Sequence, residues 1–388
     1  MPRDKSTGQM LFITNDALAV IWEQLSIYES SVATERLIKQ RANDQIDCKL
    51  LESKVEALAY CIRTAKDYMH ATSTSLTAVV TSNYYGCLWL AAACAVATPS
   101  ADTDLDSIER ATKKGHGLAN LADDADNAQF PDNEYAYIKE QGFYRKFLEW
   151  TGTANDVVKQ IAWSGKSPGT YSDVKDEQKT LCISVSELLA RIPELGLMFE
   201  QVTGRDARCF ELFPASNGLN FRTQTGDPNV QAMGVYGDYS RKYLLESGLA
   251  LDNLCEYQPH QKHGSHANSR WAGFASHIGE GVNFFDYVGE HPEDHRFYQS
   301  PIVGYHFISP LLGVIQNPLA IHLMLSYELS ILARYRPAIW RRILEGNLDQ
   351  YRILITAYNR IFERIVPQLA LCSIVGRRVR VPSPGVWG

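Results

Sequence analysis

Residues 84–99, YYGCLWLAAACAVATP, form the longest apolar run of this chain. The run is too short to cross a bilayer comfortably, because a spanning helix needs about 20 apolar residues. It predicts instead a helix from about Ser82 to Val96 that ends before Thr98 and Pro99, since proline cannot continue a helix. A helix that is apolar on all sides must be covered by other elements. We therefore expect it to be the buried centre of a mainly α-helical fold.

Helices are also expected on both sides of this run. Residues 16–42 and 48–71 place apolar side chains at intervals of three and four, which is typical of amphipathic helices. Towards the other end of the chain, Asn317 can cap a helix and Pro318 suits its first position. A long apolar pattern follows them, and residues 346–375 predict a last helix or helix pair.

The middle of the chain has a different pattern. Residues 184–204 predict one helix, with Ser184 and Glu187 spaced as a capping box. Beyond Arg208 the sequence is rich in glycine, asparagine, aspartate and aromatic residues, which is typical of short strands joined by turns. The expected strands are RCFELFP (208–214), NFRTQTG (220–226), GVNFFDYVG (281–289) and IVGYHFI (302–308).

These patterns divide the chain into four parts. We expect a helical region, a helical connector, a β-containing α+β insertion, and C-terminal helices that complete the bundle and carry a basic tail. Their bounds are 1–150, 151–206, 207–310 and 311–388. The chain length suits one large domain or two smaller ones.

The composition indicates a soluble protein of the cytoplasm. None of the eight cysteines forms a Cys-x-x-Cys pair, so the sequence indicates neither a zinc ribbon nor a redox motif. Residues 1–16 contain no apolar core of signal-peptide length, and we expect no membrane contact. The net charge of −6 gives no global basic field for nucleic acid. Any contact with RNA would therefore come from a local patch.

Several segments resemble the bacterial YaaC-like family, in an order and spacing that cover roughly residues 15–370. They are AKDYMHATSTSLTAVVTSNYYGCLWLAAACAVATP, KKGHGLANL, ELLARIPELGLMFEQVTG and NPLAIHLMLSYELSILARYRPAIWRRIL. The last segment is the most specific, since it ends a helix with Ser-x-x-x-Arg-Tyr-x-Pro at 330–337 and places Trp340 three positions after the proline. The biochemistry of this family is not established, so the resemblance implies little chemistry.

The N-terminal half is similar, more distantly, to HEPN domains. The likeness lies in the helix YYGCLWLAAACAV (84–96), followed after a linker by GHGL (115–118). The resemblance implies a helical bundle that often dimerises, and many such domains are metal-independent RNases of toxin–antitoxin, CRISPR and phage-defence systems. Active members typically carry Arg, four to six residues, then His, a pattern that Arg110 and His116 meet. It implies an RNase effector in phage defence or a toxin-like system. RNA would be its substrate, with no cofactor, a homo-oligomeric state and a protein partner from a neighbouring gene.

The Arg110–His116 pair suits RNA cleavage without metal. Histidine titrates near neutrality and can move the proton of the 2′-hydroxyl group, while the planar fork of arginine can hold two phosphate oxygens. Lys113 and Lys114 would add local attraction for RNA. We also expect a helix to begin near His116, so that its first amide groups favour an anion.

Tyr84 and Tyr85 are candidates for the substrate side of the same site. On a buried helix, one tyrosine of such a pair is expected to pack while the other reaches a hydrogen-bond partner. A place beside a catalytic groove, in contact with the substrate, is the functional alternative.

A structural role for the Arg–His pair stays open. An arginine followed, after four to six residues, by a histidine also occurs at Arg63–His70 and Arg270–His277, so spacing alone does not identify a site. In this interpretation His116 caps or packs locally and its two neighbouring glycines shape a helix entrance. The protein would then be a non-catalytic scaffold that binds a ligand or partner.

A histidine-rich loop gives a third hypothesis. His260, His263 and His266 lie at intervals of three. Three histidines are numerically enough for a catalytic zinc site, which would make the protein a metal hydrolase. A polar, exposed loop explains the same cluster without a metal.

Overall fold

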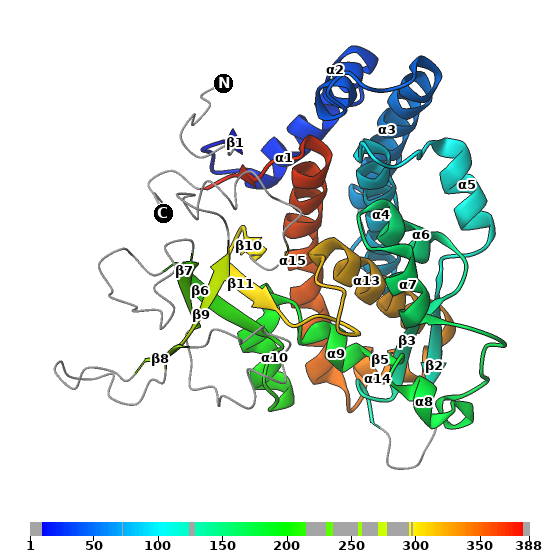
Figure 1. Cartoon of the computed structure of the whole chain (residues 1–388). Helices are drawn as coiled ribbons and strands as arrows, with labels where there is room; N and C mark the ends of the chain where they lie inside the picture. Colours follow the sequence, from blue (N-terminus) through cyan, green and yellow to red (C-terminus); the bar gives the residue numbers. More distant parts are fainter. Residues whose placement is uncertain are drawn as a thin grey trace.

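The computed structural model describes residues 10–71, 73–123, 129–214, 230–235, 255–257, 271–277, 295 and 298–382. The fold over these residues is mainly α-helical, as the sequence predicts. A continuous hydrophobic core joins helices from the beginning and the end of the chain. Figure 1 shows the C-terminal helices packed between the N-terminal helices and a separate sheet.

Helix α4 (Leu76–Ala97) is the central helix of the core. It packs against α3 (Cys48–Met69), α13 (Pro318–Tyr335) and α15 (Asp349–Val375). Its length and hydropathy would also allow it to span a membrane, but 72% of its apolar window is buried inside the protein. The prediction of a buried central helix is therefore confirmed, and the helix is consistent with a soluble protein.

Shorter helices cover the outside of this core. Helix α1 (Ala17–Ile27) packs on α15 and α3, α2 (Ser31–Arg41) packs on α3, and α14 (Pro337–Glu345) packs on α13 and α15. The predicted cap at Asn317 is confirmed, because its side chain accepts hydrogen bonds from the first free amide groups of α13.

A four-stranded sheet lies within the part of the chain that was expected to be helical. It contains β2 (Leu118–Ala122), β3 (Glu134–Lys139), β4 (Ala162–Trp163) and β5 (Ile183–Ser184). Strand β2 is antiparallel to β3, which also pairs with β4 and β5. The prediction that a helix begins near His116 is wrong, because the residues directly after its turn form β2.

The expected acidic linker before His116 is partly helical. Helix α5 (Leu105–Lys113) begins after Asp104, whose side chain accepts a hydrogen bond from the amide of Ser107. The following helices are α6 (Phe143–Trp150), α7 (Asn155–Ile161) and α8 (Asp176–Lys179), with a 3₁₀ turn at Tyr171–Asp173.

The single helix expected over residues 184–204 is divided into two. Helix α9 (Val185–Leu189) begins after Ser184, whose hydroxyl group accepts from the amide of Glu187 as predicted. A 3₁₀ turn at Pro193–Leu195 then precedes α10 (Gly196–Thr203). Pro193 has no amide hydrogen to donate to the preceding turn, which favours a break there, and it stands at the first position of the 3₁₀ turn.

The insertion contains a six-stranded antiparallel sheet in the order β10-β11-β6-β7-β9-β8. Its strands are β6 (Cys209–Pro214), β7 (Val230–Val235), β8 (Cys255–Tyr257), β9 (Trp271–His277), β10 (Tyr298–Ser300) and β11 (Gly304–Ile308). Strands β6 and β11 confirm two expected strands, whereas segments 220–226 and 281–289 lie outside the described residues. Figure 1 shows this sheet on the side of α15 that faces away from α3 and α5.

The two ends of the described chain meet in a small parallel sheet. Strand β1 (Met10–Leu11) pairs with β12 (Val379–Arg380), which directly follows the long helix α15.

Candidate functional site

His116 lies in a tight turn between α5 and β2. Gly115 and Gly117 have φ values of 98° and 79°, which L side chains rarely adopt and which end the helix. The carbonyl groups of Gly115 and His116 accept hydrogen bonds of 3.0 and 2.8 Å from the amides of Phe143 and Tyr144. The first turn of α6 therefore fixes the backbone on which the histidine stands.

This turn makes a very close approach to the start of α6. A Cβ atom on Gly142 would lie 2.4 Å from the amide nitrogen of Gly117, and Gly142 has a φ of 120°. Only glycine fits at both positions. The first amides of α6 are used by the turn itself, so they do not form the anion site that the sequence suggested near Gly115.

The side chain of His116 is oriented by Tyr84 on the central helix. Its Nδ1 atom lies 2.6 Å from the hydroxyl group of Tyr84, a side chain that is only 1% exposed. The ring of Tyr327 packs against both of them. Because Tyr84 is buried, it positions the histidine from inside rather than forming part of a surface for substrate. The bond at Nδ1 leaves Nε2 as the atom of His116 available for chemistry.

Burial lowers the pKa of His116 below its usual value of 6.5, and the positive charge of Arg334 lowers it further. The same burial raises the pKa of Tyr84, so its hydroxyl group keeps its proton. The imidazole is thus neutral at physiological pH. A neutral histidine can take up a proton, which a permanently charged one cannot.

Arg334, near the end of α13, is the arginine that acts on His116. Its Nε donates to the carbonyl of Ser330 (3.1 Å), its Nη2 to the hydroxyl of Ser330 (3.1 Å) and its Nη1 to the hydroxyl of Tyr85 (3.4 Å). The guanidinium carbon lies 5.8 Å from the ring centroid of Tyr85 and 5.0 Å from that of Tyr335. Within the described residues Arg334 forms no ion pair with a carboxylate. Its charge is held in place and remains available to an anion.

The surface beside Arg334 is aromatic. Tyr85 stacks on Tyr68 of α3 with ring centroids 5.3 Å apart. Tyr335 is 65% exposed and Tyr68 is 37% exposed. Of the two adjacent tyrosines singled out in the sequence, Tyr85 therefore reaches this surface and Tyr84 does not.

The basic residues of the 110–114 segment have local partners or face solvent. Arg110 lies on the exposed side of α5 and donates to the hydroxyl of Ser107 (2.9 Å). Lys113 forms an ion pair of 2.7 Å with Glu109, and Lys114 is exposed at the end of the helix. Their side chains form no hydrogen bond or ion pair with His116 in the part of the chain that the structure describes. The Arg110–His116 pair stays a prediction.

Two buried carboxyl groups, Glu134 at the start of β3 and Glu328 on α13, lie close to Asn120 of β2. The side chain of Asn120 donates to Glu328 (2.7 Å) and, more weakly, to Glu134 (3.4 Å), and Arg336 donates to Glu134 (2.9 Å). Burial and the nearby Glu134 raise the pKa of Glu328 well above its usual value. Burial therefore favours the protonated form of Glu328, and its Oε1 atom has no hydrogen-bond partner among the described residues.

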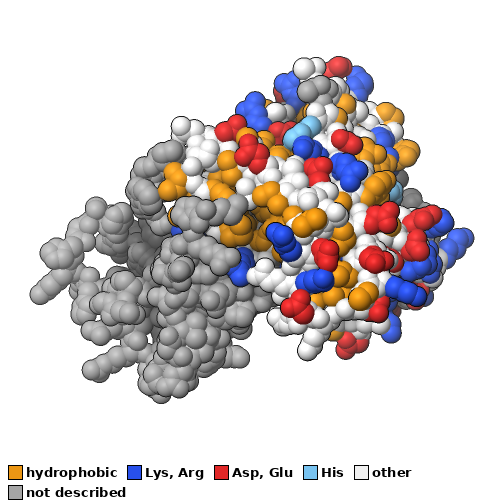
Figure 2. Space-filling model, turned by 90° about the horizontal axis from the view of Figure 1, so that it is seen from above, with side chains coloured by type: hydrophobic (Ala, Val, Ile, Leu, Met, Phe, Trp, Pro, Cys, Tyr) orange, Lys and Arg blue, Asp and Glu red, His pale blue; other side chains and the backbone are white. Residues whose placement is uncertain are grey.

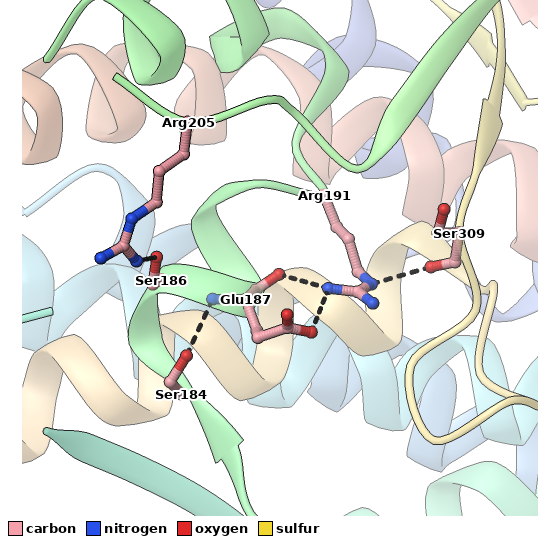
Figure 3. Close-up of polar contacts among 6 residues, drawn as sticks. All are labelled: Ser184, Ser186, Glu187, Arg191, Arg205 and Ser309. Atoms are coloured by element: carbon pink, nitrogen blue, oxygen red, sulfur yellow. Dashed lines mark hydrogen bonds and ion pairs between the residues drawn. The ribbon is translucent and has the colours of Figure 1, made fainter. Parts of the chain in front are cut away.

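A separate polar pocket of about 400 Å³ lies between α9 and the end of α10. Figure 3 shows polar contacts around α9: Arg205 of the pocket lining donates to Ser186 (3.0 Å), and Arg191 donates to Glu187 (2.7 Å) and to the carbonyl of Ser309 (2.8 Å). Arg205 also forms an ion pair with Asp132. These arginines hold the connector against the sheets, and each has partners within the protein. The pocket is a weaker candidate than the His116 site.

No three His, Cys, Asp or Glu side chains gather as a possible metal site in the described part of the chain. The three histidines of the proposed metal loop, His260, His263 and His266, lie outside the described residues.

Sequence spacing alone did not connect Arg334 with His116. The signal was present in the Ser-x-x-x-Arg-Tyr-x-Pro motif at the end of α13, in which Ser330 holds Arg334 and Tyr335 covers it. The motif does not predict that Arg334 lies near the His116 turn, which comes from a distant part of the chain.

Comparison with known proteins gives one result for the family and none for individual relatives. The family model described as "YaaC-like Protein" matches residues 26–374. No curated protein and no solved structure matches the chain.

Proposed function

The chain belongs to the YaaC-like protein family, and we propose that it is a metal-independent ribonuclease that acts through His116 and Arg334. One observation carries the proposal. A half-buried histidine with a lowered pKa lies within the field of an arginine that has no carboxylate partner in the described structure. A proton-transfer group beside a fixed cation is the combination that cleavage of a phosphodiester requires.

In the proposed reaction the 2′-hydroxyl oxygen of RNA attacks the adjacent phosphorus, and the bond from phosphorus to the 5′-oxygen breaks. In the tautomer whose Nδ1–H donates to the hydroxyl oxygen of Tyr84, the Nε2 atom of neutral His116 accepts the proton of the 2′-hydroxyl group. Arg334 donates hydrogen bonds to the phosphate oxygens as negative charge builds on them. The products are a 2′,3′-cyclic phosphate and a strand with a free 5′-hydroxyl group.

The 5′-oxygen needs a proton as it leaves. Protonated His116 can return the proton it has taken, or the histidine of a second copy can supply one. A homodimer that joins two His116–Arg334 pairs in one groove is the arrangement that the HEPN-like resemblance suggests. The HEPN-like bundle and the dimer are part of this proposal.

The exposed basic residues of α5 have a supporting role in the proposal. Arg110, Lys113 and Lys114 face solvent at the end of the helix that leads into the His116 turn. They would hold the RNA backbone outside the reaction centre. A phage-defence or toxin-like role would require such a ribonuclease to be controlled, and a protein partner from a neighbouring gene is a suitable means.

A non-catalytic scaffold is the second candidate. The observation in its favour is the number of contacts that fix His116, since the 2.6 Å bond to Tyr84 and the aromatic packing also suit a structural histidine. In that case the polar pocket beside Arg205 would hold a ligand or a partner side chain.

The test is cleavage of total RNA and of a defined tRNA by purified protein in EDTA, with His116→Ala beside the parent. The proposal expects cleavage by the parent alone, and it expects the variant to keep the circular dichroism spectrum of the parent. Equal turnover by the two proteins would contradict the assignment. A stable complex with the product of a neighbouring gene, without any RNA turnover, would favour the scaffold.

A further inference from the structure

We infer that this site takes single-stranded RNA, with an unpaired base stacked on the ring of Tyr335 while Arg334 holds the adjoining phosphate. The inference depends on the proposed function in that it places RNA at the same site. It adds the form of the RNA that is bound and the residue that recognises it.

Tyr335 offers one free aromatic face. The guanidinium group of Arg334 lies 5.0 Å from its ring centroid, while 65% of the residue is exposed. A large aromatic side chain so exposed at the end of a helix gains little from the protein core. Every nucleobase has a flat face that can stack on such a ring, and stacking on an arginine-supported aromatic group is a recurring way to bind single strands.

A second ring pair continues the surface beyond Arg334. Tyr85, whose ring centroid lies 5.8 Å from the guanidinium carbon, stacks on Tyr68 with an angle of 25° between the ring planes. Tyr68 is itself 37% exposed. Two aromatic rings, those of Tyr335 and Tyr85, therefore lie close to one fixed guanidinium group, which suits the alternation of bases and phosphates along one strand.

The charge distribution disfavours a duplex. The chain has a net charge of −6, and among the described residues visible in Figure 2 acidic and basic side chains are interspersed instead of forming a broad basic field. Duplex binding depends mainly on neutralising many phosphates, and the bases of a duplex are already stacked. A surface with exposed tyrosines beside an arginine that has no carboxylate partner among the described residues gains more from unpaired bases.

The experiment measures binding without cleavage. A labelled 2′-O-methyl RNA 12-mer cannot be cleaved, because it lacks the attacking hydroxyl group. Its affinity for the full-length parent protein is measured by fluorescence anisotropy, first as a single strand and then annealed to its complement. We expect the single strand to bind at least about tenfold more tightly, since stacking of one base contributes about that factor.

Variants then assign the contact. Tyr335→Ala should weaken binding of the single strand about tenfold, and Tyr335→Phe should keep it. Tyr60→Ala is the matched control, since Tyr60 is 45% exposed on α3 but packs edge-on against Trp89 and has no arginine on its ring among the described residues. It should bind as the parent does.

Equal affinity for strand and duplex, absence of binding, or unchanged binding by Tyr335→Ala would each overturn the inference. Failure of the proposed function gives a different result, because a protein without nuclease activity can still prefer the uncleavable single strand. Conversely, cleavage that depends on His116 but not on Tyr335 would leave the ribonuclease standing without this mode of recognition.

Discussion

The hydroxyl group of Tyr84 lies 2.6 Å from Nδ1 of His116, and this bond connects the buried centre of the protein to its candidate site. Tyr84 stands on the helix around which the core is packed, whereas His116 stands on a turn held by α6. The imidazole ring is thereby fixed on two sides, and its Nε2 atom is set apart for chemistry. The predictions below test what this arrangement does.

Tyr84→Phe should reduce RNA cleavage about tenfold while leaving the fold intact. The change leaves Nδ1 of a half-buried histidine without its partner, which lowers the free energy of unfolding by about 1 kcal/mol. It also leaves the imidazole ring less firmly oriented, which slows cleavage. Cleavage assays and urea unfolding measure the two effects. Tyr298→Phe is the control, because it removes another buried hydroxyl with a 2.6 Å bond, to Glu194, far from this site. It should lose stability and keep activity, and a loss of activity in both variants would assign the effect to stability alone.

Arg334→Ala should reduce cleavage about 10²- to 10³-fold, as expected when a fixed donor to a developing negative charge is removed. Arg334→Lys should recover only part of the loss, since an ammonium group does not reproduce the planar fork. The matched variant is Arg110→Ala, which removes an exposed arginine from α5. We expect it to affect RNA affinity only modestly. The reverse order of effects would instead support the Arg110–His116 pair that the sequence suggested.

Cleavage should rise with pH through a midpoint below 6.5 and then stay level to about pH 8. Burial lowers the pKa of His116, so the folded protein keeps it neutral at pH values where the unfolded chain begins to protonate it. The same shift makes the protein less stable as the pH falls below 6.5, because the unfolded state then binds the proton more tightly. Arg334→Ala should raise the pKa of His116, because it removes the positive charge that opposes protonation of the imidazole. Histidine NMR titration measures it directly, and a midpoint above 6.5 in the parent would contradict the burial of the ring.

Gly142→Ala should destabilise the protein by more than about 2 kcal/mol, because the new methyl group meets the backbone of Gly117 at a φ that L residues avoid. Gly152→Ala is the control, since Gly152 also has a positive φ, of 106°, but has no atom near the added carbon. Its cost should be about 1 kcal/mol, from backbone strain alone. Urea denaturation measures the free energy of unfolding of both variants. Equal losses would contradict the close contact between Gly142 and the backbone of Gly117.

Glu328→Gln should stabilise the protein at pH 8 and have little effect near pH 4.5. The folded protein keeps Glu328 protonated while the unfolded chain ionises above its usual pKa of 4.5, so the parent loses stability as the pH rises. The amide keeps the shape of the group and cannot ionise. Unfolding curves across this range measure the difference. The exposed Glu345→Gln controls for the loss of one negative charge, and identical pH profiles for parent and Glu328→Gln would contradict a neutral Glu328.

Local rules predicted part of this fold from the sequence. The apolar run at 84–99 gave the central helix, and the caps at Ser184 and Asn317 were correctly assigned, because a side chain and an amide two or three positions away decide them. The sheet around β2 and β3 was missed, since its strands are short and lie between helices. Gly115 ends the region of α5 and Pro193 separates α9 from α10, and apolar periodicity predicts neither break.

The sequence pointed to His116, Tyr84 and Tyr85 as residues of the candidate site, but not to Arg334. His116 was found from its place in the sequence, but its partners come from α4 and α13, which tertiary packing alone brings to the turn. Arg110 is close in sequence and turns outward, whereas Arg334 is distant in sequence and acts on the ring. Short-range spacing cannot distinguish the two. The roles of Tyr84 and Tyr85 likewise depend on which side of α4 faces the core.

The central claim is tested most directly by identifying the products formed from one defined RNA strand in EDTA. Mass spectrometry would follow the reaction for the parent protein and for His116→Ala. We expect the parent to give fragments with 2′,3′-cyclic phosphate and 5′-hydroxyl ends, and we expect the variant to lose about 10²- to 10⁴-fold in rate. The same fragments formed at the same rate by both proteins would contradict a catalytic His116.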